Sequence, residues 1–307
     1  MAMNVVEQER GQRRQMWERL LAAGGPRGVA PSVLRELGIY GGQQGIWVDK
    51  IRTANLTPDR IGVAVGLLHT GSSYADDLAE DGVVYHYPST LRPGRDAVEV
   101  AATKAARVHR LPVFVITYPS PEAATRNVHL GWIQDWEDAT RLFLVAFSEE
   151  QPPPRPVTGA PEEDAFVLTE SRRDIRREVA ARFGQARFKF DVLRRYGAQC
   201  AVCDLPIPEA LDAAHLCPRT EAGSNDARNG LVLCAVHHRA FDAGLFGFEP
   251  VTFGLRYRPS GPDAAMLRIG RAGLEHLAHQ PHREALEWCW RRWNQRHTVA
   301  ENRPTGT

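Results

Sequence analysis

The chain has few cysteines, no long apolar run and almost no net charge. Its five cysteines are an odd number among 307 residues, so a disulfide framework is not expected. No segment approaches the roughly 18 consecutive apolar residues of a membrane-spanning helix, and the first residues lack the apolar core of a signal peptide. These absences predict a cytoplasmic protein with no membrane partner.

The near-neutral total conceals local patches of charge. The formal net charge is +1, yet residues 171–200 contain nine Lys or Arg against three Asp or Glu. Because local basic patches, and not total charge, create a phosphate-binding surface, this stretch is a candidate contact for nucleic acid.

The sequence pattern divides the chain into four parts. Residues 1–37 are predicted to be a helical segment, with one helix over 5–23 and a second from Ser32, as its N-cap, to Leu37. This segment is interpreted as a packing or dimerisation element. Residues 149–171 are rich in proline and acidic residues and are predicted to be a linker.

Residues 38–148 are dominated by short apolar runs. Strands are predicted at 45–48, 61–68, 82–87, 111–118 and 142–147, with one helix at about 96–110. Many strands with a single helix predict a compact β-barrel-like domain. Since the rest of the chain is helix-rich, the predicted fold class is α+β.

Residues 172–300 are predicted to be a second domain. It begins with a basic helical region over 172–196 and ends in a helix between 274 and 293, broken at Pro281. Leu286, Trp290 and Trp293 give the last helix one apolar face, expected to pack on this domain or on a dimer partner. Cys289 in this helix is not expected to bind metal.

Two metal half-sites frame the middle of this second domain. The first is Cys200-Ala201-Val202-Cys203, and the second is Cys234-Ala235-Val236-His237. Each places two ligands three residues apart, and together they form a Cys₃His set typical of structural Zn²⁺. The alternative is four buried side chains without a metal.

The residues between the half-sites resemble the HNH endonuclease family. They read Leu211-Asp212-Ala213-Ala214-His215, then Gly223-Ser224-Asn225-Asp226, then Arg228-Asn229-Gly230-Leu231, and His238 follows the second half-site. The resemblance covers roughly residues 190–250 and implies a zinc-stapled ββα-metal nuclease fold, with His215, Asn229 and His238 as the catalytic residues.

The chemistry of phosphodiester hydrolysis assigns a role to each residue. A neutral histidine can take a proton from the attacking water, which is expected of His215. By resemblance, His238 is a ligand of a catalytic divalent ion (Mg²⁺, Mn²⁺, Co²⁺ or Ni²⁺). Asn229 would orient the base or brace the loop between the two strands.

The chain departs from the HNH family at one position. Many relatives have an Asp or His as second metal ligand directly before the base, where this chain has Ala214. Asp212 is the nearest carboxylate and is expected to supply this ligand, while Asp242 is a further candidate that would instead brace the loop. Phosphate contacts are expected from Arg219, Arg228 and Arg239; the alternative for each is a solvated surface arginine.

Residues 38–148 resemble the SRA (SET and RING-associated) domain, a PUA-like barrel that flips methylated cytosine out of DNA. The resemblance rests on Tyr74-Ala75-Asp76-Asp77, Val83-Val84-Tyr85-His86-Tyr87 and the helix that follows Gly94-Arg95-Asp96. It implies that Tyr74 and Tyr87 stack on the flipped base and that Asp77 accepts its exocyclic amine. Pro88 stands where the family has Thr, and the alternative is that both tyrosines belong to the core.

The sequence as a whole predicts a modification-dependent restriction endonuclease that cuts double-stranded DNA carrying 5-methylcytosine or 5-hydroxymethylcytosine. The alternatives are an HNH nuclease that recognises phosphorothioate or a glucosylated base, and a reader of modified DNA without catalytic activity. A double-strand cut requires two active sites, so a homodimer is expected.

Overall fold

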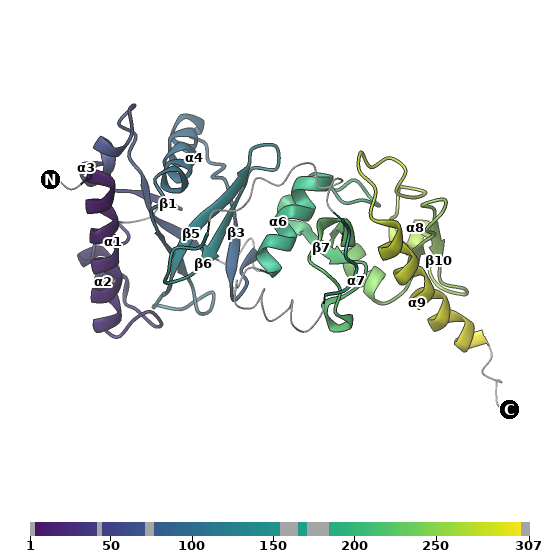
Figure 1. Ribbon diagram of the computed structural model, residues 1–307. Coiled ribbons are helices and arrows are strands. Elements are labelled where there is room, and N and C mark those ends of the chain that lie inside the picture. The colour runs from purple at the N-terminus through teal and green to yellow at the C-terminus, as the bar shows by residue number, and fades with distance from the viewer. Residues whose placement is uncertain (1–3, 42–44, 71–76, 154–164, 171–183, 302–307) are drawn as a thin grey trace. The chain divides into compact units, whose positions relative to one another are not determined.

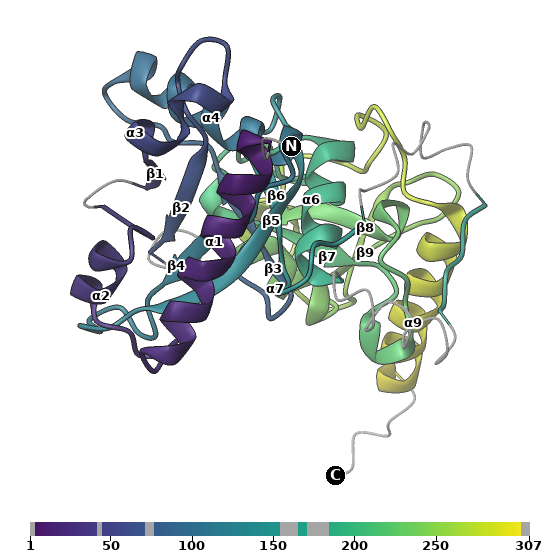
Figure 2. The same ribbon diagram turned by 60° about the vertical axis from the view of Figure 1, so that its left-hand side comes forward.

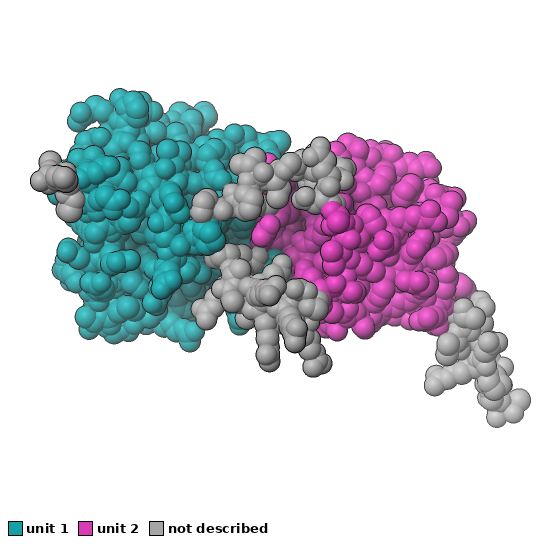
Figure 3. Space-filling model, viewed as in Figure 1, with its two compact units in different colours: residues 1–157, 181–186 teal, residues 158–180, 187–307 magenta. Residues whose placement is uncertain are grey.

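The computed structural model describes residues 4–41, 45–70, 77–153, 165–170 and 184–301 (Figure 1). The chain divides into two units: unit 1 comprises residues 1–157 and 181–186, and unit 2 comprises residues 158–180 and 187–307 (Figure 3). Among the described helices, none has the length and apolar character needed to cross a bilayer.

Unit 1 is a mixed six-stranded sheet with helices on both faces. Its helices are α1 (Val5–Ala22), α2 (Pro31–Glu36), α3 (Lys50–Thr53) and α4 (Pro93–Val108). Its strands are β1 (Ile46–Val48), β2 (Ala64–His69), β3 (Gly82–His86), β4 (Val113–Thr117), β5 (Asn127–Glu137) and β6 (Leu142–Phe147). The strand order is β1-β2-β4-β5-β6-β3, and only the β2–β4 pair is parallel.

The sheet of unit 1 is curled, and in the described residues it is open. β1 and β3 are its two edges, so the β-barrel-like domain that the sequence predicted is present as a curled sheet. The β3 edge still approaches β2, the strand next to the opposite edge, because the Tyr85 hydroxyl on β3 donates to the Leu68 carbonyl on β2 at 3.2 Å. The unit is therefore α+β with a partly closed sheet.

Alternation along β4 places its side chains in two separate cores. Phe114 and Ile116 pack in one cluster with Met16, Trp17 and Leu20 of α1. The intervening residues of β4 pack in the other cluster, which includes Ala106 of α4. This is the period of two expected for a strand covered on both faces, and it makes α1 part of the core of unit 1 (Figure 2).

Two details of unit 1 differ from the sequence prediction. Strand β5 was not predicted, because polar residues fill its second half, although its first half contains the buried residues Val128, Leu130 and Trp132. The proposed N-cap, Ser32, is wrong: α2 begins at Pro31 and is capped by Ala30. Proline suits the first helical position, where its fixed φ is helical and the amide proton is not needed.

Unit 2 is built around a ββα arrangement. Its helices are α6 (Gln185–Tyr196, of which the first two residues cluster with unit 1), α7 (Ala235–Asp242), α8 (Ala264–Leu267) and α9 (Arg283–Glu301). Its strands are β7 (Leu211–His215), β8 (Gly230–Cys234), β9 (Phe246–Phe248) and β10 (Leu255–Tyr257). β7 and β8 form an antiparallel pair in which His215 faces Gly230.

A glycine allows α6 to lie against the β7–β8 pair. A Cβ at Gly230 would come within 2.6 Å of Val192 and 2.7 Å of Phe188, both on α6. Any larger residue would push the helix away from the strand. The Asn-Gly sequence at the start of β8 therefore sets the distance between α6 and the strand end that carries His215.

The C-terminal helix packs on unit 2 through its apolar face. The Leu286 side chain is fully buried, and the Trp293 indole donates to the Gly244 carbonyl at 3.1 Å. The helix starts at Arg283, so the helical prediction for 274–282 is wrong. Pro281 lies in the irregular segment before the helix and does not break a longer helix.

Candidate active site and metal centre

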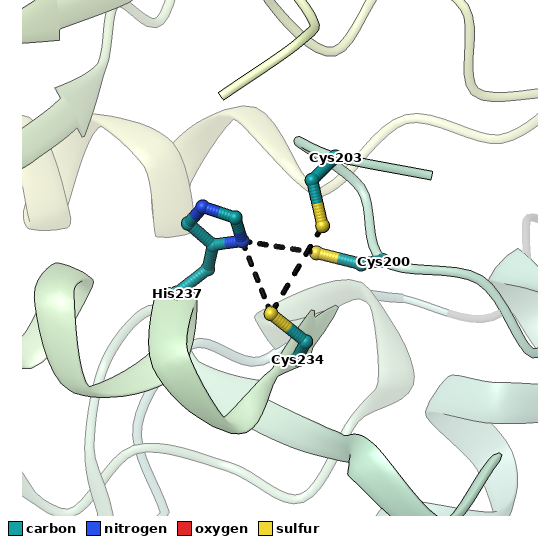
Figure 4. Close-up of side chains that lie close together, drawn as sticks. All are labelled: Cys200, Cys203, Cys234 and His237. Atoms are coloured by element: carbon teal, nitrogen blue, oxygen red, sulfur yellow. Dashed lines mark hydrogen bonds between the residues drawn. The ribbon is translucent and has the colours of Figure 1, made fainter. Parts of the chain in front are cut away.

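Four side chains of types that can bind metal, three cysteines and a histidine, converge beside the ββα unit (Figure 4). The ligand atoms of Cys200, Cys203, Cys234 and His237 all lie within 4.8 Å of one another, and three of the four residues are buried. Nδ1 of His237 lies 3.1 Å from Sγ of Cys234 and 3.6 Å from Sγ of Cys200. This cluster can hold one metal ion.

A backbone carbonyl orients the histidine of this cluster. Nε2 of His237 donates to the Leu267 carbonyl at 2.8 Å. Because a carbonyl only accepts, the proton is on Nε2, and Nδ1 presents its lone pair to the sulfur atoms. Such an outer partner is the usual means of fixing the tautomer of a metal-binding histidine.

His215, at the end of β7, is held on two sides. Its ring stacks on Phe188 with centroids 3.6 Å apart, and its Nε2 lies 3.3 Å from Oδ1 of Asn225. Burial lowers the pKa of His215 to about 4. The imidazole is therefore neutral near pH 7, which is the state in which a histidine can accept a proton.

Asn229 is fully buried and bonded to the loop between β7 and β8. Its Oδ1 accepts from the Cys217 amide at 2.9 Å, and its Nδ2 donates to the carbonyls of Cys217 at 3.0 Å and Ser224 at 2.9 Å. The sequence predicted two alternative roles for Asn229, orienting the general base or stabilising the loop between β7 and β8. These hydrogen bonds fit the second role.

Asp212 and His238 come together on the side of the strand pair that α7 covers. Nδ1 of His238 lies 3.3 Å from Oδ2 of Asp212, and its Nε2 lies 3.6 Å from Oδ2 of Asp242. The hydrogen bond with His238 lowers the pKa of Asp212. A carboxylate and an imidazole are thus adjacent, with a second carboxylate within reach.

Asp212 stands two residues before Ala214 on β7. Side chains two residues apart on a strand lie on the same face, so Asp212 and Ala214 share one face of β7. Ala214 is fully buried, whereas Asp212 is half-buried and faces His238. The Asp212 carboxylate therefore lies on the same face of β7 as Ala214, two residues earlier in the strand.

The three arginines expected to contact phosphate lie in different surroundings. Arg239 is exposed. Arg219 is half-buried and donates to Glu170 at 2.6 Å. Arg228 is 7% exposed and pairs with Asp226 at 2.6 Å, so a phosphate contact does not fit its burial, and the residue braces the loop before β8.

The residues proposed to read the modified base are only partly brought together. Tyr74 lies outside the described residues. Asp77 is 3% exposed, and its Oδ2 lies 2.7 Å from Nε2 of His86. Tyr87 belongs to the core: it is 8% exposed, its ring lies 4.4 Å from that of Phe143, and its hydroxyl donates to Asp138. The alternative interpretation, a core tyrosine, fits this position of Tyr87.

Three residues at these sites had no assigned role in the sequence prediction. His86 contacts Asp77, Asn225 contacts His215, and Glu170 accepts hydrogen bonds from both Arg219 and the amide of Asn225. Glu170 lies in the stretch assigned to the linker. His86 and Asn225 lie within the quoted motifs but Glu170 lies in none, and the contacts of all three depend on how the chain folds back.

Residues 200–249 match the family model described as HNH endonuclease. The match includes both metal half-sites, the β7–β8 pair and α7, so these residues form an HNH endonuclease domain, which is a phosphodiester hydrolase. No curated protein matches the chain.

Two solved structures resemble the chain at low similarity. The modification-dependent TagI restriction endonuclease is 18% identical, with 88% of this chain and 93% of that chain covered and a TM-score of 0.34. KRYPTONITE in complex with mCHG DNA and SAH is 16% identical, with 50% of this chain and 45% of that chain covered and a TM-score of 0.30. The family match to residues 200–249 is what assigns an activity.

Proposed function

We propose that this chain, with its HNH endonuclease domain at residues 200–249, hydrolyses double-stranded DNA that carries 5-methylcytosine or 5-hydroxymethylcytosine. The observation that carries the proposal is the placement of a neutral His215 on β7 together with Asp212, which pairs with His238 of α7. Incubation of modified and unmodified plasmids with the protein and a divalent ion tests it.

In this proposal His215 is the general base. Its burial keeps the ring neutral, and its contacts with Phe188 and Asn225 hold the ring in one orientation. A proton taken from water by this ring leaves a nucleophile for the phosphorus atom. A general base in this position typically contributes about 10²–10⁴-fold to the rate.

The catalytic divalent ion would be held by Asp212 and His238. Oxygen and nitrogen donors of these types suit Mg²⁺, Mn²⁺, Co²⁺ or Ni²⁺. When bound, such an ion neutralises the charge that develops on the phosphate and on the leaving oxygen. Asp242, on the other edge of the His238 ring, is the second candidate carboxylate ligand.

The Cys₃His cluster would hold a structural Zn²⁺, and its geometry fits that ion. With Zn–S bonds of about 2.3 Å, tetrahedral coordination separates two sulfurs by roughly 3.8 Å. The sulfurs of Cys203 and Cys234 lie 4.0 Å apart. His237 is next to His238, so the cluster would also fix the first turn of the helix that carries the catalytic ligand.

Selection of modified DNA would be the task of residues 38–148. The support is the sequence resemblance to SRA domains, together with the pairing of Asp77 and His86. Asp77 would accept the exocyclic amine of a flipped cytosine, and Tyr74 would replace its lost stacking. Since a double-strand cut needs two active sites, we also propose that the protein acts as a homodimer.

Replacement of Tyr74 by alanine is expected to weaken binding to modified duplex about tenfold, because base–aromatic stacking contributes on the order of 1–3 kcal/mol. Asp77→Ala should reduce discrimination further, since the cytosine amine loses its acceptor. Both variants should retain weak, phosphate-driven binding to unmodified DNA. The measurement is a pair of affinities, for modified and unmodified oligonucleotides at one salt concentration.

The matched control is Tyr118→Ala, which removes an aromatic ring packed on the Arg126 guanidinium; Tyr118 is not one of the residues proposed to read the base. This variant should preserve the ratio of the two affinities. A wild-type protein without preference for either modified cytosine would exclude base flipping. A preference that survives both pocket substitutions would show that other residues read the base.

A further inference from the structure

Residues 165–170, which we call the strap, are built into unit 2. Thr169 pairs with Gly223 as a β-bridge. The Glu170 amide donates to the Ala222 carbonyl, and the Ser224 amide donates to the Leu168 carbonyl, both at 2.9 Å. These backbone bonds attach the strap to the loop between β7 and β8.

The strap is also anchored by an aromatic contact. The Phe166 ring stacks on His282 with centroids 3.7 Å apart, and the Arg228 guanidinium lies 5.2 Å from the centre of the same ring. The strap therefore has contacts at both of its ends, and the position of Glu170 is defined by packing as well as by backbone pairing.

The Glu170 carboxylate organises the loop that faces His215. Its Oε2 accepts from Arg219 at 2.6 Å, and its Oε1 accepts from the Asn225 amide at 3.1 Å. The Glu170 side chain is only 13% exposed. Bonds to a buried carboxylate are stronger than neutral ones, so Glu170 fixes the backbone of Asn225.

Asn225 in turn determines which nitrogen of His215 carries the proton. Its Oδ1 lies 3.3 Å from Nε2 of His215, and an amide oxygen only accepts hydrogen bonds. The proton is therefore on Nε2, and Nδ1 has the free lone pair. The stack of the ring on Phe188 opposes a flip that would exchange the two nitrogens.

We propose that Glu170 and Asn225 are positioning residues for His215, which select its Nε2–H tautomer and leave Nδ1 as the proton acceptor. The inference rests on the proposed function for the role of His215 as the general base. Neither residue would touch the DNA or the metal. They act through the orientation and the tautomer of the ring.

Loss of the Asn225 side chain should lower turnover but not substrate binding. Asn225→Ala is expected to reduce kcat about 100-fold with KM unchanged, since small errors in the position of a catalytic group have effects of this order. Glu170→Ala should reduce kcat about tenfold, because Asn225 remains but its loop is less fixed. Asn225→Asp, which retains an acceptor oxygen, should recover most of the lost activity.

Ser224→Ala is the matched control in the same loop. Its hydroxyl is buried and has no hydrogen-bond partner among the described residues, so its removal should leave kcat and the tautomer of His215 unchanged. A loss in Ser224→Ala as large as that in Asn225→Ala would show that any disturbance of the loop is sufficient, and would contradict a specific role for Asn225.

The tautomer is measured directly by ¹⁵N NMR of the imidazole rings, with the His215 signal identified by its loss in His215→Gln. The wild type should show the Nε2–H form, and Asn225→Ala a mixture of both forms. An Nδ1–H form in the wild type, or unchanged kcat in Asn225→Ala, would overturn the proposal. A wild type that shows the Nε2–H form but cuts no modified DNA would instead contradict the proposed function.

Discussion

Replacement of His215 by alanine is expected to reduce DNA cleavage about 10³-fold, within the range typical of a lost general base. DNA affinity and the folding of unit 2 should change little, because the ring acts on water and its stacking partner Phe188 is itself 2% exposed in the core. The experiment compares single-turnover cleavage of a modified plasmid with equilibrium binding of the same DNA.

The matched control for His215 is His276→Ala, since His276 is an exposed histidine of the same unit and should be dispensable for cleavage. Near wild-type cleavage by His215→Ala would contradict its assignment as the base. His238→Ala should be as inactive as His215→Ala, through loss of the catalytic ion. A comparable loss in Asp212→Ala would assign the second ligand to Asp212, and a mild loss would assign it to Asp242 or water.

Cys203→Ser is expected to remove the structural metal and to unfold the nuclease domain. Structural Zn²⁺ contributes an apparent ~10–16 kcal/mol in zinc-finger peptides, whereas a whole domain is stable by only about 5–15 kcal/mol. Weakening one of four ligands should therefore be enough to lose the fold. Metal content by elemental analysis and thermal unfolding should fall together, and chelation of the wild type should have the same effect.

Cys289→Ala provides the comparison for the metal site. Cys289 is buried in α9 and lies outside the four-residue cluster, so this variant should retain one Zn²⁺ per chain and unfold only slightly earlier. Well-folded wild-type protein without zinc, or a Cys203→Ser variant with full metal content, would exclude the structural zinc site.

The metal cluster and the order of the HNH residues could be predicted from the sequence because their chemistry depends on short spacings. Two side chains three residues apart, as in Cys200–Cys203 and Cys234–His237, can point to one common position because of local backbone geometry. The four ligand atoms of the two pairs do lie close together. Asp212 was harder to assign, since its role depends on a contact with α7, which follows it by more than 20 residues. The structure supplies that contact at 3.3 Å.

The remaining features depend on long-range packing, which spacing does not encode. Glu170 contacts Asn225, which is 55 residues away in the sequence. The proline-rich, acidic composition of the stretch before Glu170 does not indicate that residues 165–170 pair with the nuclease domain. The sequence position of Tyr87 is compatible with either a base-binding pocket or the core. Its contact with the Phe143 ring places it in the core. Whether the sheet of unit 1 is open or closed also depends on long-range pairing, so the sequences of the individual strands could not predict it.

The central claim is most directly tested by cleavage of three plasmids, carrying cytosine, 5-methylcytosine or 5-hydroxymethylcytosine, with a divalent ion and with either wild type or His215→Ala. The proposed function predicts that the wild type cuts at least one modified plasmid, leaves the unmodified plasmid largely intact, and requires both the ion and His215. Equal cutting of all three plasmids would contradict selection by modification, and binding of modified DNA without any cutting would contradict the assignment as a nuclease.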